Sequence, residues 1–161
     1  LIFPNSSCLV MFSAKTVLHD FSATDKLKPI KGVVIKTCLL DHHDNSIGYR
    51  VEFDGRSVCY ITDTTHTPGK PDKAILKIIK DTDLVIYDAT YTDAEFPQFW
   101  NFGHSTWEEG ARLCEAANVK RYCPFHHRPS RSDTQLDALN REARRMFKKT
   151  SFAIEGKTIR V

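Results

Sequence analysis

The hydrophobic positions of the chain form a clear pattern after residue 30. The apolar stretch Val33–Leu40 predicts a buried strand that ends at the polar turn Asp41–Asn45. Apolar and polar residues then alternate in Tyr49–Phe53, and Val58–Thr62 continues beyond an Asp54-Gly55 pair, which is typical of a tight turn. This region therefore predicts one strand followed by a β-hairpin.

Helical spacing begins after the hairpin. Pro71 and Asp72 mark a helix start, and the apolar residues that follow share one helix face: Ala74, Ile75, Ile78 and Ile79. The next apolar run, Leu84–Tyr87, is short enough for a buried strand. Together with the preceding strand these segments predict a β-α-β unit.

Two further helices are indicated by capping-box patterns at Ser105–Glu108 and Ser132–Gln135. Asn118 is a suitable left-handed stop for the first helix, and the strand Arg121–Phe125 is expected between the two. Apolar residues predict the buried faces of these helices: Ala111, Leu113, Cys114 and Ala117 in the first, and Leu136, Leu139, Ala143 and Met146 in the second.

The two ends of the chain are less regular. Residues 1–29 predict loops and strand fragments, including the apolar run Cys8–Phe12, and are interpreted as a leading segment. At the other end, Phe152–Ile154 and Thr158–Val161 predict a closing hairpin around Glu155-Gly156. We expect one α/β domain over residues 1–161, with a mixed sheet formed by residues 30–161.

Composition narrows the class of protein. The chain has 161 residues, 41% of them hydrophobic and 27% charged, which is typical of a globular domain. It contains no apolar run long enough for a membrane span and no signal-peptide pattern. Its five cysteines are scattered without a C-x-x-C pair, which favours a reducing compartment, so we expect a cytoplasmic protein. A net charge of +3 does not by itself indicate nucleic-acid binding.

Residues that bind metals or transfer protons follow four of the predicted strands: His42, Asp63, Asp88 and His126. Because ligands bind beyond the carboxyl ends of strands in open α/β sheets, we expect these side chains to share a cleft. His104, directly before a predicted helix, is a fifth candidate. Any one of these residues alone is more often structural, as a turn former or a packing residue. Together, imidazoles and carboxylates suit zinc, manganese or iron.

Neighbouring features allow other interpretations. In the pairs His42-His43 and His126-His127, side chains on an extended backbone point in opposite directions, so one of each pair is expected in the cleft. The basic run Arg141–Lys149 suits either phosphate binding or the solvated face of a helix. The aromatic stretch Phe96–Phe102 suits either a loop over the substrate or the core.

Five short strings resemble the metallo-β-lactamase fold hydrolases, in particular the phosphodiesterase branch that includes ribonuclease Z and the phosphonate-operon phosphodiesterase. They follow the family's order: His42 with Ser46-Ile-Gly-Tyr-Arg50, Tyr60-Ile-Thr-Asp-Thr64, Asp83-Leu-Val-Ile-Tyr-Asp-Ala-Thr90, Gly103-His-Ser-Thr106 and Pro124-Phe-His-His127. The resemblance implies the C-terminal half of an αββα sandwich.

The resemblance also implies roles for single residues. His42 resembles a metal-ligand histidine, Asp63 the aspartate that bridges two metals, and His126 a histidine ligand of the second metal. His104 resembles the general acid, and Asp88 stands where the family has a glutamate that orients this acid. In the intact family fold the implied cofactor is a pair of Zn²⁺ or Mn²⁺ ions, and we expect partial or empty occupancy in this chain. The implied substrate is a phosphodiester in a cyclic nucleotide or RNA.

One family signature is absent: the chain contains no His-x-His-x-Asp-His motif and no His-x-His at all. The three implied metal ligands are fewer than a dinuclear site needs. A half sandwich also leaves the apolar face of its sheet uncovered, which favours a homodimer or a complementary N-terminal half. We therefore expect a truncated hydrolase that is inactive alone, or alternatively a non-catalytic remnant that acts as a dimerising or binding module. Nucleic-acid binding through Arg141–Lys149 is a weaker third hypothesis.

Overall fold

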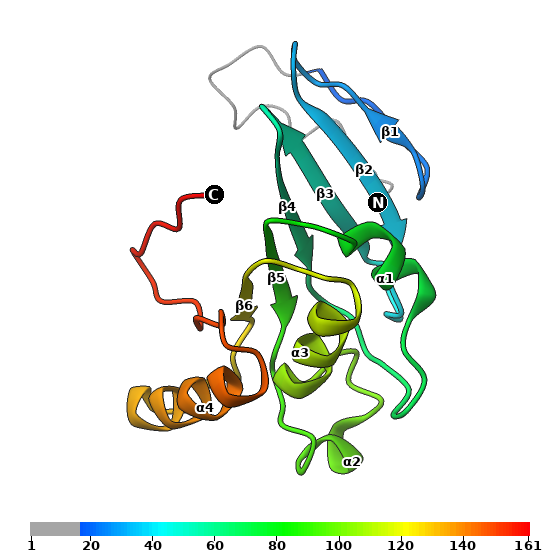
Figure 1. Cartoon of the computed structure of the whole chain (residues 1–161). Helices are drawn as coiled ribbons and strands as arrows, with labels where there is room; N and C mark the ends of the chain where they lie inside the picture. Colours follow the sequence, from blue (N-terminus) through cyan, green and yellow to red (C-terminus); the bar gives the residue numbers. More distant parts are fainter. Residues whose placement is uncertain (1–16) are drawn as a thin grey trace.

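The computed structural model describes residues 17–161, so the run Cys8–Phe12 lies outside the described residues. The chain forms a mixed sheet with helices (Figure 1). The strands are β1 (Lys26–Leu27), β2 (Val34–Leu39), β3 (Ile47–Phe53), β4 (Arg56–Ile61), β5 (Leu84–Asp88) and β6 (Tyr122–Phe125). The helices are α1 (Lys73–Ile79), α2 (Phe96–Phe99), α3 (Trp107–Ala116) and α4 (Asp133–Met146).

The strands of the sheet lie side by side in the order in which they occur in the sequence. Strands β1 to β4 pair antiparallel, whereas β4, β5 and β6 pair parallel. The predicted hairpin is confirmed in β3 and β4, and the predicted β-α-β unit is confirmed in β4, α1 and β5. The parallel strands therefore place their carboxyl ends at one edge of the sheet.

Side-chain caps fix where the helices begin. The Asp72 carboxylate accepts hydrogen bonds from two backbone N–H groups of α1, and the capping box at Ser132 and Gln135 is confirmed at the start of α4. The predicted box at Ser105 is wrong, because Thr106 caps α3 by accepting from the Glu109 N–H. Ser105 is instead fully buried and bonded to other side chains.

The main core lies between one face of the sheet and helices α1 and α3. Alternate strand residues point into it, including Cys59, Ile61, Val85 and Tyr87. Figure 1 shows α1 and α3 over this face, and burying it removes a large apolar area from water. The described cysteines are free thiols, and burial raises the pKa of Cys59 to about 11. These thiols are therefore packing residues.

The opposite face of the sheet carries exposed apolar side chains. Val51, Phe53 and Tyr60 lie on this face, and Phe53 is 57% exposed. The C-terminal segment runs past its β4–β6 end, where Tyr60, Ile86 and Phe125 line a hollow together with Phe152. Among residues 17–161, the helix that packs on β3 and β4 is α1, and its buried isoleucines belong to the core on the other face. We call Val51, Phe53 and Tyr60 the open sheet face.

The predicted closing hairpin is wrong, because residues 152–161 contain no strand. The edge of β6 offers hydrogen-bonding partners to the incoming chain, so the N–H groups of Ser151 and Ala153 donate to the carbonyls of Tyr122 and Pro124. Gly156 then turns the backbone at a φ of 75°, but the last residues do not return to pair. The segment thus pairs with β6 instead of with itself.

None of the helices within residues 17–161 has the length and apolar character that crossing a membrane requires.

Candidate active site

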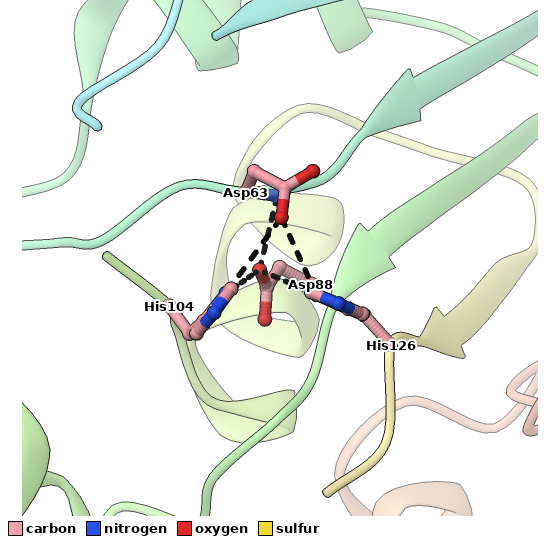
Figure 2. Close-up of side chains that lie close together, drawn as sticks. All are labelled: Asp63, Asp88, His104 and His126. Atoms are coloured by element: carbon pink, nitrogen blue, oxygen red, sulfur yellow. Dashed lines mark hydrogen bonds and ion pairs between the residues drawn. The ribbon is translucent and has the colours of Figure 1, made fainter. Parts of the chain in front are cut away.

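Four polar side chains from different elements meet at the carboxyl ends of the parallel strands. Asp88 is the last residue of β5, Asp63 and His126 follow β4 and β6, and His104 lies before α3. One ligand atom from each residue lies within 4.8 Å of the others. In Figure 2 the two histidines approach the two carboxylates from opposite sides. The structure therefore brings together four of the five candidate residues.

Asp88 is the buried centre of the cluster, with no solvent exposure. Its Oδ1 atom accepts hydrogen bonds from the Thr90 hydroxyl at 2.9 Å and from the backbone N–H groups of Thr90 and Ser105. Its Oδ2 atom accepts from the Asp63 N–H at 3.0 Å. Burial raises the pKa of Asp88, but hydrogen bonds from His104 and His126 outweigh it and hold the pKa at about 2. Asp88 is therefore an anion at neutral pH.

Both histidines turn the same ring atom toward Asp88. The Nδ1 atoms of His104 and His126 lie 2.9 and 3.4 Å from Asp88 Oδ2. An anionic acceptor favours the proton on Nδ1 of each ring, which leaves Nε2 for other partners. The hydrogen bond to Asp88 also raises the pKa of His126. The cluster thus holds two imidazoles in defined orientations around one carboxylate.

Asp63 is the more exposed carboxylate, with a side chain 47% exposed. Its Oδ1 atom lies 3.7 Å from His126 Nδ1 and 4.0 Å from His104 Nδ1. Both Asp63 and His126 adopt left-handed backbone conformations, with φ of 55° and 59°. This conformation costs an L-residue about 1–2 kcal/mol, and it is concentrated at functional sites. The two turns bend the chain where β4 and β6 end, and both side chains lie in the cluster around Asp88.

The donor chemistry of the cluster fits a divalent metal ion. Asp63 and His126 offer an exposed carboxylate and a half-exposed imidazole, which are ligand types that zinc and manganese accept. Asp88 is less suited to binding an ion directly, because protein donors already occupy both of its oxygens. These residues therefore fit part of one metal site, and a complete site needs further ligands from outside the cluster.

His42 does not join the cluster, contrary to the sequence-based expectation. It lies in the turn after β2, and its ring stacks on His43 with centroids 4.1 Å apart. The expectation that these two rings point in opposite directions is wrong, because the turn replaces the extended backbone on which it depended. The centroid of His42 is 6.2 Å from that of His104, so the ring borders the site.

His126 and His127 do separate. His126 enters the cluster, whereas His127 stacks on Phe152 with centroids 4.9 Å apart. Burial lowers the pKa of His127, so this imidazole is neutral at pH 7 and acts as a packing residue.

The sequence did not predict a hydrogen-bond network next to His104 that joins His66, Ser105 and Tyr87. The Ser105 hydroxyl lies 2.8 Å from His66 Nδ1 and 2.9 Å from the Tyr87 hydroxyl, and all three side chains are buried or half-buried. Because the Ser105 N–H also donates to Asp88, this network fixes the backbone next to His104. The Gly103-His-Ser-Thr106 string held the signal, which a helix-cap interpretation of Ser105 concealed.

Residues 35–127 match the family model described as "Beta-lactamase superfamily domain". Ribonuclease Z of Sulfurisphaera tokodaii is 31% identical over 139 residues, which are 86% of this chain and 43% of that protein. Ribonuclease Z of Brevibacillus brevis is 31% identical over 62% of this chain and 31% of its own length. The chain therefore spans less than half the length of these curated relatives.

Solved structures show the same fold at lower identity. The metallo-β-lactamase fold protein YhfI from Bacillus subtilis has a TM-score of 0.71 at 17% identity, over 85% of this chain and 53% of that one. Zn²⁺-bound PqqB from Methylobacterium extorquens has a TM-score of 0.69 at 15% identity, over 88% and 55%. The short form of human tRNase Z has a TM-score of 0.58 at 22% identity, over 80% and 43%.

Proposed function

The chain belongs to the β-lactamase superfamily, and from this premise we propose that it forms part of a metal-dependent phosphodiesterase. The proposed substrate is an RNA or cyclic-nucleotide phosphodiester, the proposed general acid is His104, and Asp88 is the residue that positions it. The observation that carries the proposal is the 2.9 Å contact between His104 Nδ1 and Asp88 Oδ2 beside Asp63 and His126. A positioned histidine next to a candidate metal site is suited to protonating a leaving oxygen.

The proton-transfer role rests on the electrostatics of the pair. Asp88 stays ionised because its pKa is about 2, so its Oδ2 atom is a strong acceptor that orients the His104 ring through Nδ1. The Nε2 atom then carries the second proton of the imidazolium and delivers it to the leaving alkoxide. Asp88 acts as a positioning residue, since it touches His104 and lies away from solvent.

Asp63 and His126 are the proposed metal ligands. A bound Zn²⁺ or Mn²⁺ would supply an activated water and stabilise negative charge on the phosphoryl group. His42 is the third proposed ligand, and it lies outside the four-residue cluster. Since these ligands do not complete a dinuclear site, the proposal includes further ligands from a complementary N-terminal half.

The open sheet face supports the same requirement for a partner. Val51 is 37% and Phe53 57% exposed, although the other face of the sheet carries the packed core. Exposed apolar area of this kind is typical of an interface. We propose that a complementary half covers this face, with a second copy of the chain as the alternative occupant.

A non-catalytic role is the second candidate function. The absence of any His-x-His pair and the separation of His42 from the cluster favour a remnant that binds a partner without hydrolysis. In that case the chain binds less than one metal ion per molecule and has no activity in any assembly.

One experiment separates the two functions. Hydrolysis of bis(p-nitrophenyl) phosphate is measured with added Mn²⁺ or Zn²⁺, for the chain alone and for a longer form with a His-x-His-x-Asp-His segment before residue 1. The hydrolase proposal expects activity in the longer form, with loss in Asp63→Ala and retention in a variant of the exposed His19. A longer form that binds two metal ions and still fails to hydrolyse the ester contradicts it.

A further inference from the structure

A hollow of about 340 Å³ lies next to the His104 cluster, and His42 is the one lining residue to which the proposed chemistry gives a role. Three stretches line it: Asp41–His43, Thr65–Thr67, and the α2–α3 loop with Trp100, Asn101 and Gly103. Its volume lies within the range of small-molecule sites, about 300–1,000 Å³. We call it the Trp100 hollow.

The walls of the Trp100 hollow are flat rings. Trp100 is 64% exposed although it is a large aromatic residue, and His42 and His43 form a stacked imidazole pair. His66 is held by stacking on Phe96 with centroids 4.1 Å apart and by its bond to Ser105. Exposed aromatic faces beside polar groups are the surfaces on which nucleic-acid bases stack.

The hollow is fixed by specific bonds. Thr65 joins all three stretches: its N–H donates to the Asp41 carbonyl at 2.8 Å, and its hydroxyl donates to the Trp100 carbonyl at 3.1 Å. Gly103 has a φ of 80°, and a Cβ atom there would lie 2.5 Å from the His42 ring. Glycine therefore allows the α2–α3 loop to lie directly against His42.

The position of the hollow relates it to the reaction. His42 borders both the hollow and the His104 cluster, with 6.2 Å between the centroids of the two rings. A planar group in the hollow would therefore lie one ring away from the proposed proton donor. In a nucleic acid, the group at that distance from a phosphodiester is a base.

We propose that the Trp100 hollow binds a nucleobase of the substrate, stacked on Trp100 next to the scissile phosphodiester. The ligand class rests on the proposed function, because only a nucleotide substrate brings a base to this position. Trp100 is then a specificity residue: it selects nucleotide esters over phosphodiesters that lack a base, and it takes no part in proton transfer.

The fluorescence of Trp100 itself can test this proposal. It has two tryptophans, of which Trp100 is 64% exposed and Trp107 only 6%. Tryptophan fluorescence of the 161-residue chain is titrated with adenosine 5′-monophosphate and, in parallel, with ribose 5-phosphate. The proposal expects saturable quenching by the nucleotide beyond that of free N-acetyltryptophanamide, and no quenching by the sugar phosphate.

Variants assign the signal. Trp107→Phe should keep the quenching and Trp100→Phe should lose it. Since one base–aromatic stack contributes about 1–3 kcal/mol, Trp100→Ala should weaken nucleotide binding, followed by NMR, about 5- to 150-fold. Equal responses to both ligands, no saturable response to the nucleotide, or unchanged binding in Trp100→Ala each overturn the proposal.

The titration is independent of catalysis, since stacking needs neither metal nor a complementary half. If the nucleotide quenches the fluorescence but no assembly hydrolyses a phosphodiester, the base site is supported and the phosphodiesterase proposal fails. If RNA is hydrolysed and Trp100→Ala leaves its KM unchanged, the phosphodiesterase proposal is supported and the base site fails. Thr65→Val, which removes the bond to the Trp100 carbonyl, should weaken nucleotide binding less than Trp100→Ala.

Discussion

The Nδ1 atom of His104 lies 2.9 Å from Oδ2 of Asp88, a carboxylate with no solvent exposure. The same oxygen lies 3.4 Å from His126 Nδ1, so one buried anion orients two imidazoles from different parts of the chain. Five backbone and side-chain donors besides His126 hold this carboxylate: the N–H and hydroxyl of Thr90, the N–H groups of Ser105 and Asp63, and His104. Changes at Asp88 should therefore affect both stability and histidine titration.

Asp88→Asn should destabilise the fold by about 1–3 kcal/mol, the usual cost of leaving buried hydrogen-bonding groups without their partner. The low pKa of Asp88 contributes stability that is present above the unfolded pKa of about 4 and is lost as the pH falls toward 2. The raised pKa of His126 contributes stability that is present below its unfolded pKa and is lost as the pH rises through the folded pKa. In the metal-free variant, NMR titration should show a lower His126 pKa, whereas Asp137→Asn, on the exposed face of α4, should leave it unchanged.

His104→Ala should lower phosphodiester hydrolysis by the longer, motif-bearing form about 10²–10⁴-fold, the contribution of a general acid. The effect should be smaller for a p-nitrophenyl ester than for RNA, because the nitrophenolate leaving group needs less protonation. Initial rates for the two substrates measure this difference. An equal loss on both substrates would show that His104 acts in another way.

Glu108→Gln should stabilise the chain above neutral pH. Burial raises the pKa of Glu108 to about 7, and its Oε2 atom has no hydrogen-bond partner among the described residues. A raised carboxyl pKa gives stability below the unfolded value, about 4.5, and this stability is lost as the pH rises through 7. After allowance for partial exposure, the gain at pH 8 should be about 1–2 kcal/mol.

Thermal unfolding at two pH values checks this prediction. At pH 5 the variant and the parent chain should unfold at similar temperatures, since both side chains are then neutral in the fold. Glu115→Gln, at an exposed position later in the same helix, is the matched control and should show no such pH-dependent gain.

Phe53→Lys combined with Val51→Lys should reduce self-association and binding of a complementary half, because both residues lie on the open sheet face. Sedimentation velocity measures the change. Met146→Lys, at a position on α4 that is 43% exposed, introduces one charge away from this face and should leave association unchanged. Unchanged association in the double variant would place the partner elsewhere.

Arg144→Glu combined with Arg145→Glu should weaken RNA binding if the basic face of α4 contacts phosphates. Arg141, Arg144, Arg145, Lys148 and Lys149 are all exposed, opposite the buried residues Ala143 and Phe147. Each lost phosphate contact should reduce the slope of log K against log salt by about 1. Lys77→Glu with Lys80→Glu, at the C-terminal end of α1, is the control of equal charge change. Equal losses in both double variants would indicate non-specific attraction.

Much of the site was predictable because three of its residues follow strands. Asp63, Asp88 and His126 come directly after or at the end of apolar runs, and parallel pairing brings such positions together. His42 also follows a strand, β2, which runs in the same direction as β4 but lies two positions away from it, with β3 between them. The distance across the sheet therefore separates His42 from the cluster.

The sequence by itself determined the order of the elements, the β-α-β unit and the residue types at the strand ends, because apolar periodicity and turn chemistry act locally. Only the tertiary structure decided that Asp88 contacts both His104 and His126, and that Thr106 caps α3 in place of Ser105. It also decided that residues 151–153 hydrogen-bond to the edge of β6. The physical reason is the same in each case: a buried polar group or a strand edge binds whichever donor or acceptor folding brings to it, and that partner is distant in the sequence.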